Sequence, residues 1–408
     1  MLGQVDGLNH SWMAERPEVV FIVNSKSQAD DAVAVLRHLE RPSLVVALWH
    51  DVFQHISRQQ LPNNAVAIDL STRFKNKLRV LAAIVKGRRL VSALTHRAPF
   101  PVFVFGDDVN PSTMAVLARV RRRKTRSVLI VDGILDPRDP QRLMNQPSLT
   151  LLGRLGPSVL RRLGTLPAPH PFGAGGCDHV AAHGEFMRRT LIDWGVPVNT
   201  IAVTGWPQLD RAFREGISAH APKTYKRALY LGLLMAEKGW ATDQTDSEIL
   251  RALSDFSIAN PDVELVIRPH PSEAAASYLR HFAHLGREPL KLDSAPDVAA
   301  AVRESSVVAM HFPSSVLLEA MIAGLPTLFF DLGLECQRNS ITNHQAVLVG
   351  DGEADFLRLM RSVIDNPNSV PRAAQLEFIG LHAGNLDGNS GWRVARLIDS
   401  TRPTMEVP

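Results

Sequence analysis

Short apolar runs alternate with helical patterns along almost the whole chain. "EVVFIVNS" is followed by the helical "SQADDAVAVLRHL" and then by "SLVVALW", and the same order recurs after residue 225 in "RALYLGLL", "DSEILRALSDFSIA" and "VELVIRP". Continuous strands of this kind, separated by helices, predict βαβ units and a mostly parallel sheet in an α/β protein. The polar stretch 214–227 has neither period. We therefore predict two doubly wound, Rossmann-like domains, 1–220 and 221–408, with a C-terminal helix that can pack back on the first domain.

The composition excludes several classes of protein. Of the 408 residues, 45% are hydrophobic and 21% charged, as in ordinary globular proteins. Two cysteines, Cys177 and Cys336, are too few for a disulfide framework. The N-terminus lacks the basic-then-apolar order of a signal peptide, and no apolar run approaches the roughly 18 residues of a membrane span. We therefore expect a cytoplasmic chain without an integral membrane anchor.

Polar residues follow the carboxyl ends of three expected strands in the second half of the chain. Ligands of open parallel sheets bind beyond such strand ends. "VELVIRP" runs into "RPHP", and a strand at "VVAM" gives way to "HFPSSVLLEAMIAGLP". The residues of interest are Gly232, Arg268, His270, Ser314, Ser315 and Glu319.

Each of these residues also has a purely structural interpretation. A serine pair at a helix start is often only a cap, a helical glutamate is often solvated, and a histidine between prolines is often part of a loop. Taken together, a cation, hydroxyl donors beside a helix N-terminus and a carboxylate suit a nucleotide: the donors its phosphate, the carboxylate its ribose. No "GxxxxGKS" and no clean "GxGxxG" occurs, so this would be a nucleotide site without a Gly-rich loop.

"RPHP", followed about 40 residues later by "SSVLLEAMIAGLPTLFF", resembles the C-terminal domain of GT-B glycosyltransferases. The similarity is greatest to bacterial capsule and surface-polysaccharide transferases, including Kdo and sialic acid transferases and CDP-glycerol glycerophosphotransferases. "VAAHGEFMRRTLIDWGVPVNTIAVTGWPQLD" (180–210) and "GNLDGNSGWRVARLI" (384–398) also resemble this group. The resemblance spans about 125–398 and implies a GT-B-like fold, with two Rossmann-like domains facing each other across a cleft.

The resemblance also implies roles for particular residues. His270, Ser314 and Ser315 would hold the donor phosphate, and Glu319 the ribose. A base on the first domain must deprotonate the acceptor hydroxyl. Relatives often carry a His-Gly pair there, whereas this chain has Asp132-Gly133 in "SVLIVDG". We rank Asp132 first as the base, although an Asp-Gly turn would give the same sequence.

The pair His183-Gly184 also follows an expected strand, within a segment that resembles a structural part of the relatives. His183 is therefore our second candidate for the base. The glycine-rich "FGAGGCD", 172–178, precedes a strand, and we interpret it as a mobile loop.

Positive charge is concentrated in the first half. Residues 1–220 hold 28 of the 45 Lys and Arg and 18 of the 41 Asp and Glu, so the two halves carry about +10 and −6. Eight of these cations lie in 72–97, among apolar residues at helical spacing, and six more lie in 118–126. Such stretches are either solvated helix faces or a surface for an anionic membrane, which would place the chain at the inner membrane face. A nucleic-acid partner is not expected, because stacking aromatic residues are absent from both stretches.

These observations lead to one preferred function and two alternatives. We expect a GT-B transferase that moves a sugar or glycerol phosphate from a CMP-, CDP- or UDP-linked donor to a surface-polysaccharide or lipid-linked acceptor. No metal-ligand spacing is present, so we expect no metal and no resident cofactor. One alternative is a non-hydrolysing UDP-sugar 2-epimerase, which would use several carboxylates and a glycine pair where this chain has Ser314-Ser315. The other is a catalytically silent binding or scaffold protein of the same fold.

Overall fold

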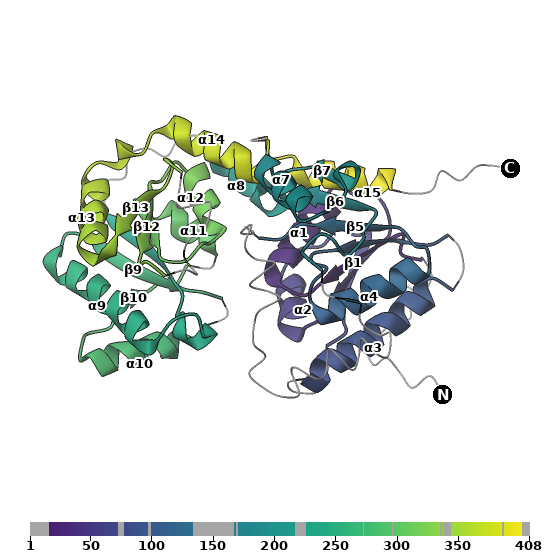
Figure 1. The fold of residues 1–408 in the computed structure, drawn as a ribbon, viewed down its shortest axis with the longest axis horizontal. Coiled ribbons are helices and arrows are strands. Elements are labelled where there is room, and N and C mark those ends of the chain that lie inside the picture. Colours follow the sequence, from purple (N-terminus) through teal and green to yellow (C-terminus); the bar gives the residue numbers. More distant parts are fainter. Residues whose placement is uncertain are drawn as a thin grey trace. The chain divides into compact units, whose positions relative to one another are not determined.

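The computed structural model shows two compact units joined within one chain (Figure 1). Unit 1 contains residues 1–210 and 382–408, and unit 2 contains residues 211–381. The structure describes residues 16–71, 77–96, 99–133, 167–168, 170–216, 226–271, 273–295, 297–334, 337, 344–385 and 387–401. The chain therefore divides after Asp210, whereas we predicted a boundary near residue 220.

Unit 1 is built on a seven-stranded parallel sheet with the order β3-β2-β1-β4-β5-β6-β7. Its first two strands are buried along their whole length, as expected for a parallel sheet covered on both faces. The strand order reverses between β1 and β4, so this sheet has its switch point there. The strands are β1 (Val19–Val23), β2 (Ser43–Ala47), β3 (Ala65–Asp69), β4 (Val102–Phe105), β5 (Ser127–Ile130), β6 (His179–Ala182) and β7 (Ile201–Val203).

Two helices of unit 1 begin at residues whose side chains cap the first turn. The Ser25 hydroxyl accepts the Gln28 amide at 3.1 Å at the start of α1, and Asn110 accepts the Ser112 amide at 3.0 Å ahead of α4. The helices are α1 (Lys26–Leu36), α2 (His50–Ser57), α3 (Lys77–Leu94), α4 (Pro111–Arg122), α7 (Glu185–Asp193) and α15 (Ser390–Ser400).

The C-terminal helix α15 packs on unit 1. Its buried residues Val394, Ala395 and Ile398 join the core formed by the sheet and α1. The Asp210 carboxylate accepts the Ser390 amide at 2.9 Å and the Gly391 amide at 2.7 Å, so a residue 180 positions earlier caps this helix. This docking brings the end of the chain into the same unit as its beginning.

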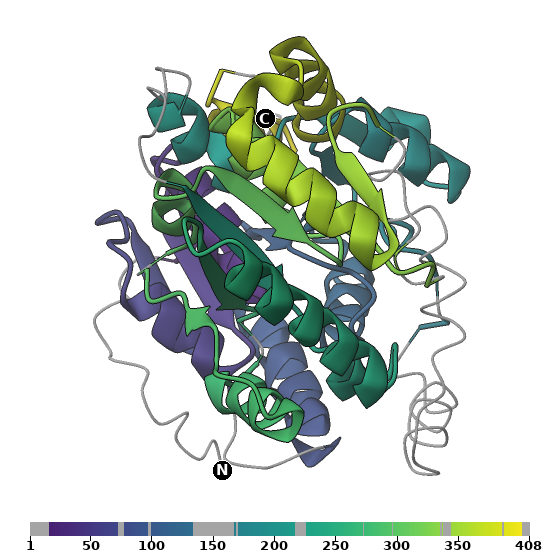
Figure 2. The same cartoon turned by 90° about the vertical axis from the view of Figure 1, so that its left-hand side faces the viewer.

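Unit 2 is built on a six-stranded parallel sheet with the order β10-β9-β8-β11-β12-β13. Helices α9 and α13 lie across the face of this sheet that is nearest the viewer in Figure 2. The order reverses between β8 and β11. The strands are β8 (Arg227–Gly232), β9 (Glu264–Pro269), β10 (Lys291–Leu292), β11 (Val307–Met310), β12 (Thr327–Asp331) and β13 (Leu348–Asp351).

The predicted linker 214–227 is partly helix and partly strand. Its first residues belong to α8 and its last, Arg227, opens β8, while 217–225 lie outside the described residues. The helices of this part of the chain are α8 (Asp210–Gly216), α9 (Asp243–Ala259), α10 (Ala275–Leu285), α11 (Val298–Arg303), α12 (Val316–Ile322), α13 (Gly352–Asp365) and α14 (Arg372–Ala383).

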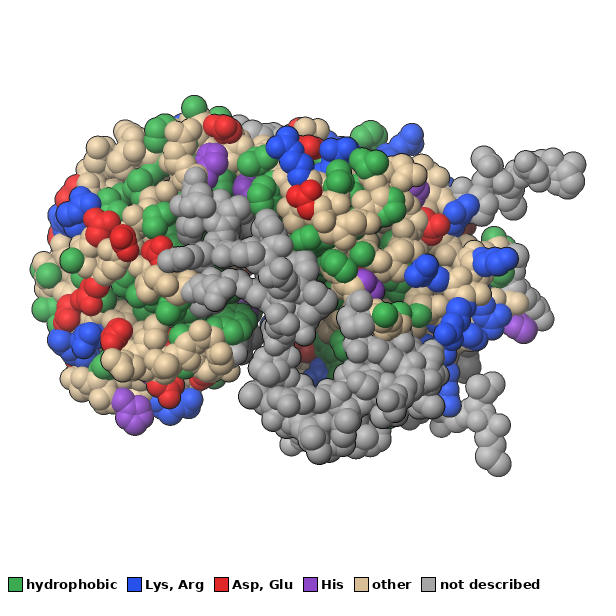
Figure 3. All heavy atoms as spheres, in the orientation of Figure 1, with side chains coloured by type: hydrophobic (Ala, Val, Ile, Leu, Met, Phe, Trp, Pro, Cys, Tyr) green, Lys and Arg blue, Asp and Glu red, His purple; other side chains and the backbone are tan. Residues whose placement is uncertain are grey.

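The two basic stretches lie largely on α3 and α4, which pack against each other. Figure 3 shows Lys and Arg side chains grouped on the right-hand side of the view. The Arg119 guanidinium donates to the Ser92 hydroxyl at 3.0 Å, and the pKa of Arg119 is lowered by burial and by the neighbouring Arg123 and Arg88. Residues 72–76 and Arg97 of the first stretch lie outside the described residues. Among the described helices, none is both long enough and apolar enough to span a bilayer.

Candidate nucleotide and acceptor sites

The predicted nucleotide residues of unit 2 gather at the carboxyl ends of neighbouring strands. Gly232 ends β8 in register with Pro269, which ends β9. The His270 amide donates to the Gly232 carbonyl at 3.1 Å, so these two predicted residues are in direct contact. β11, which leads to Ser314, pairs with β8 on its other side. Three separate sequence segments thus meet at the switch point of this sheet.

Gly232 is required by close packing. A Cβ atom added there would lie 2.5 Å from the Tyr278 hydroxyl oxygen. That hydroxyl donates to the Glu273 carboxylate at 2.8 Å, which holds it in place. The glycine therefore lets α10, which carries Tyr278, approach the end of β8.

His311 ties β11 to the loop that follows β8. The Nδ1 atom of this buried side chain accepts a hydrogen bond from the Tyr230 hydroxyl at 2.7 Å, while its Nε2 donates to the Leu233 carbonyl at 2.8 Å. A carbonyl can only accept, so Nε2 carries the proton. Burial lowers the pKa of His311 to about 4, so the ring is neutral near pH 7. "HFPSS" contains this residue, but the sequence alone did not indicate its role.

Two carboxylates hold the same loop by its amides. Glu273 accepts the Leu234 amide at 2.7 Å, and Asp246 accepts the amides of Met235 and Ala236, both at 3.0 Å. Burial raises the pKa of Asp246, and these two amides lower it. The loop after β8 is therefore fixed on both its carbonyl and its amide side before any ligand binds.

Arg268, near the end of β9, is engaged by a buried carboxylate. Its guanidinium forms an ion pair with the fully buried side chain of Asp293 and donates to the Ala295 carbonyl at 3.3 Å. Asp293 also pairs with Arg227 at 3.1 Å. Because removing one partner of a buried ion pair is costly, these contacts give Arg268 a structural role at the edge of the sheet near β10. The phosphate assignment then depends on the remaining residues.

The serine pair lies directly before α12, as predicted. Ser314 accepts the Val316 amide at 3.3 Å through its hydroxyl, which is a capping contact, whereas the Ser315 side chain makes no such bond. Both serines are half-buried, as is Glu319 in the first turn, and His270 is exposed. The capping interpretation therefore applies to Ser314 and not to Ser315.

In unit 1, Asp132 follows β5 and contacts the start of α1. Its Oδ1 accepts the Ser27 hydroxyl at 2.6 Å and its Oδ2 accepts the Ser25 hydroxyl at 3.2 Å. Burial raises the pKa of Asp132, the two serines lower it, and the nearby charge of Asp107 raises it. The residue as a whole is half-buried. A carboxylate with a raised pKa is a chemical group of the kind that can act as a general base.

Asp107, at the end of β4, is a different kind of carboxylate. Its Oδ1 accepts the amides of Val109 and Asn110 at 3.1 and 2.8 Å and the Thr113 hydroxyl at 2.9 Å. Its Oδ2 accepts the side-chain amide of Asn24, at the end of β1. With both oxygens occupied, Asp107 joins the two strands at the switch point and starts α4.

Behind Asp132 lies a second buried carboxylate, Asp31. Its Oδ1 accepts the Gln208 backbone amide at 3.0 Å, and the side-chain oxygen of Gln208 lies 3.1 Å from the Ser27 hydroxyl. Burial, and then the charge of Asp132, raise the pKa of Asp31 well above its usual range. The Trp206 indole N–H lies near enough to lower that pKa, but the geometry falls short of a hydrogen bond.

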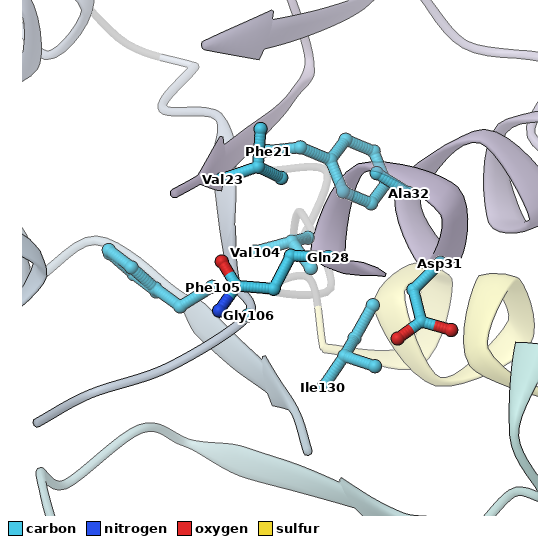
Figure 4. Close-up of a pocket in the computed structure, with 9 residues that line it drawn as sticks. All are labelled: Phe21, Val23, Gln28, Asp31, Ala32, Val104, Phe105, Gly106 and Ile130. Carbon is cyan, nitrogen blue, oxygen red and sulfur yellow. The ribbon is translucent and has the colours of Figure 1, made fainter. Parts of the chain in front are cut away.

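Asp31 also lines a small cavity between α1 and the sheet (Figure 4). Gln28 and Gly106 border it as well. Its volume of about 10 Å³ leaves room for no more than about one water molecule, so we assign the cavity to packing around the buried carboxyl group.

His183 is buried at the end of β6. Its ring stacks on Trp206 with centroids 4.1 Å apart, and its Nε2 donates to the Val131 carbonyl. Burial lowers the pKa of His183 to about 4. A buried ring with one nitrogen bound to the backbone is a poor proton acceptor near pH 7, so the geometry favours Asp132 over His183 as the base.

The glycine-rich segment 172–178 is held in place by a buried carboxylate. Asp108 accepts the Gly173 amide at 2.9 Å and the Gly175 amide at 2.7 Å. Arg121 donates to the Gly175 carbonyl at 3.1 Å. This loop is therefore fixed at both its amides and its carbonyl, in contrast to the mobile loop that we expected.

Comparison with known proteins indicates the fold. No protein-family model matches the sequence, and no curated protein sequence matches it. Among solved structures, a UDP-GlcNAc 2-epimerase from Neisseria meningitidis bound to UDP-GlcNAc is similar at 13% identity, 94% and 98% coverage of the two chains and a TM-score of 0.58. The glycosyltransferase of kitacinnamycin is similar at 15% identity, 95% and 100% coverage and a TM-score of 0.60. Anabaena HepE in complex with UDP and glucose is similar at 14% identity, 94% and 100% coverage and a TM-score of 0.55. The chain thus has a GT-B-like fold of two Rossmann-like domains, as predicted.

Proposed function

We propose that this protein is a glycosyltransferase that moves a sugar or glycerol phosphate from a nucleotide donor to a glycan hydroxyl. The observation that carries the proposal is the meeting of Gly232, His270 and the loop to Ser314 and Ser315 at the switch point of the unit 2 sheet. Open α/β sheets bind their ligands at such points. The similar structures that hold UDP or UDP-GlcNAc support a nucleotide donor.

In this proposal unit 2 binds the donor. His270, Ser314 and Ser315 hold the phosphate, and the Glu319 carboxylate accepts hydrogen bonds from the ribose hydroxyls. Hydrogen bonds to charged groups contribute about 1.5–3 kcal/mol each, so these three donors would account for much of the phosphate affinity. The nucleotide is a substrate, and the same donors stabilise the negative charge of the departing phosphate.

Unit 1 supplies the base. The Asp132 carboxylate takes the proton of the acceptor hydroxyl while the hydroxyl oxygen bonds to the anomeric carbon of the donor sugar. The bond between that carbon and the phosphate oxygen breaks, and its electron pair leaves with the nucleotide. Ser25 and Ser27 orient the carboxylate, and its raised pKa makes it a stronger base than an exposed aspartate.

A 2-epimerase is the second candidate, because Asp107 and Asp132 follow the neighbouring strands β4 and β5 and because epimerases are among the similar structures. Two features favour the transferase. Asp107 accepts two backbone amides and several side-chain donors, whereas Asp132 accepts two serine hydroxyls, so Asp132 is the less heavily engaged carboxylate of the pair. Ser314-Ser315 also stands where the epimerase would have a glycine pair.

One experiment separates these functions. UDP, CDP and CMP are first screened by thermal shift, since a ligand at 100 times its Kd stabilises a protein by about 2.7 kcal/mol. The protein is then incubated with UDP-GlcNAc in D₂O without acceptor and followed by NMR. A 2-epimerase must break the C2–H bond, so it would incorporate deuterium at C2. A transferase would leave C2–H intact. Nucleotide binding without turnover on any glycan acceptor would support the third alternative, a catalytically silent binding or scaffold protein.

We further propose that the acceptor is part of a surface polysaccharide and that it is reached at an anionic membrane. On α3, Leu81 and Val85 are each 42% exposed, and Lys86 and Arg89 are exposed beside them. Leu81, Val85 and Arg89 are spaced by four residues and so share one helix face. Apolar side chains flanked by cations are typical of helices that lie on anionic lipid.

A further inference from the structure

An aromatic pair joins the two loops that leave the switch point of the unit 2 sheet. Trp240, in the loop between β8 and α9, stacks on Phe312, which follows β11, with ring centroids 4.9 Å apart and ring planes 15° from parallel. Because β8 and β11 are the strands between which the order reverses, this stack spans the place where such sheets bind ligands.

The two rings differ in how they are held. Phe312 packs against the buried core of unit 2 and is half-buried. Trp240 is 42% exposed, although large aromatic side chains are usually well buried. The inner ring thus fixes the outer ring, and the outer ring presents its indole to solvent.

The backbone beneath Trp240 is also fixed. The Trp240 amide donates to the Met235 carbonyl at 3.0 Å, and the Met235 amide is bound by Asp246. On the other side, Gln337 donates to the His311 carbonyl at 2.7 Å, immediately before Phe312. A ring held this way loses little conformational entropy when a ligand stacks on it.

We propose that Trp240, supported by Phe312, is the stacking platform for the nucleobase of the donor. Phe312 lies only two residues before Ser314, so a base on this platform would be next to the proposed phosphate donors. Every base has a flat π face, so the platform would contribute affinity for the nucleotide without selecting the base by hydrogen bonds. This inference rests on the proposed function, because it names the part of the donor that these rings bind.

The test compares nucleotides with a ligand that lacks a base. Kd values for UDP, CMP and inorganic pyrophosphate are measured by calorimetry for the wild type, Trp240→Ala and Trp240→Phe. Quenching of indole fluorescence on titration with each ligand is a second measurement. Trp392→Ala is the matched control, because Trp392 is 51% exposed but lies on α15 of unit 1.

The platform predicts that Trp240→Ala weakens UDP and CMP binding by roughly 5- to 150-fold, and that pyrophosphate binding and the control are unchanged. Trp240→Phe should keep most of the nucleotide affinity but lose the quenching. Unchanged nucleotide binding in Trp240→Ala would overturn the stacking platform but would leave the proposed function standing. An equal loss for nucleotides and pyrophosphate would overturn it too, because it would indicate a displaced loop. A wild type that binds no nucleotide would overturn the proposed function along with it.

Discussion

The hydroxyl of Ser27, in the first turn of α1, lies 2.6 Å from Oδ1 of Asp132 at the end of β5. The two residues are 105 positions apart in sequence. A hydroxyl has one proton, so the short distance to Asp132 compared with 3.1 Å to Gln208 indicates that the carboxylate receives it. The first helix of the chain thus orients the carboxylate that we propose as the base.

Replacing Asp132 with asparagine tests this role in catalysis. The change keeps the shape of the side chain but removes its ability to take a proton. General-base help is worth about 10²- to 10⁴-fold, so turnover should fall by that factor with little change in donor Kd. Ser27→Ala should lower turnover less and should shift the acidic limb of the pH–rate profile to higher pH, because the hydrogen bond lowers the pKa of Asp132. Near-full turnover in Asp132→Asn would exclude Asp132 as the base.

The sequence was sufficient to predict the strands that lead to the candidate residues, but not the contacts made at their ends. Apolar runs and the β-α alternation predicted β8, β9 and β11, and so the segments that meet near Gly232. The partner of Arg268 could not be predicted, because Asp293 follows a strand of only two residues, β10, that no apolar run announces. The contacts of Asp210 with Ser390 and Gly391 at the start of α15 could not be predicted either, because they join segments that are distant in sequence.

His270→Ala tests the phosphate site of unit 2. The side chain is exposed, so its removal should leave the fold intact, and the Kd for UDP should rise by roughly 10- to 150-fold, the equivalent of one hydrogen bond to a charged group. His284→Ala is a suitable control, since His284 is an exposed histidine on α10 of the same unit. If both variants bind UDP as the wild type does, His270 is not a phosphate ligand.

Asp31 should make the protein less stable as pH rises. Its folded pKa is raised well above the unfolded value of about 3.9, so the folded state holds this proton at pH values where the unfolded state has lost it. The stabilisation is complete below pH 3.9 and is lost as pH rises through the folded pKa, with a slope of at most about 1.4 kcal/mol per pH unit. In chemical denaturation, Asp31→Asn should therefore gain stability relative to the wild type as pH rises from 4 to 8. A pH-independent difference between the two proteins would contradict this assignment.

His183 should have the opposite effect. Its folded pKa of about 4 lies below the unfolded value of about 6.5, so the unfolded state takes up a proton first as pH falls. The contribution is complete above pH 6.5 and is lost towards pH 4, to a total of about 3 kcal/mol. His183→Phe keeps a ring against Trp206 but cannot titrate. It should be less stable at pH 7, because the Val131 carbonyl loses its donor, and its free energy of unfolding should fall less steeply between pH 6.5 and 4. Equal slopes would show that His183 does not titrate as the structure predicts.

The outer face of α3 provides the test of membrane binding. Wild-type protein should bind vesicles containing anionic lipid at low salt and should be released as salt screens the charges, since the Debye length falls from about 30 Å at 0.01 M to about 8 Å at 0.15 M. Lys86→Gln/Arg89→Gln removes two exposed cations, and with each worth about 1 kcal/mol near an anionic surface the partition coefficient should fall roughly 30-fold. Arg188→Gln/Arg189→Gln removes the same charge from α7, where both arginines pair with Glu185, and should bind like the wild type. Equal losses of binding in the two double variants would show that net charge, and not the face of α3, determines binding. If the wild type bound neutral vesicles as strongly as anionic ones, membrane binding could not be explained by electrostatic attraction.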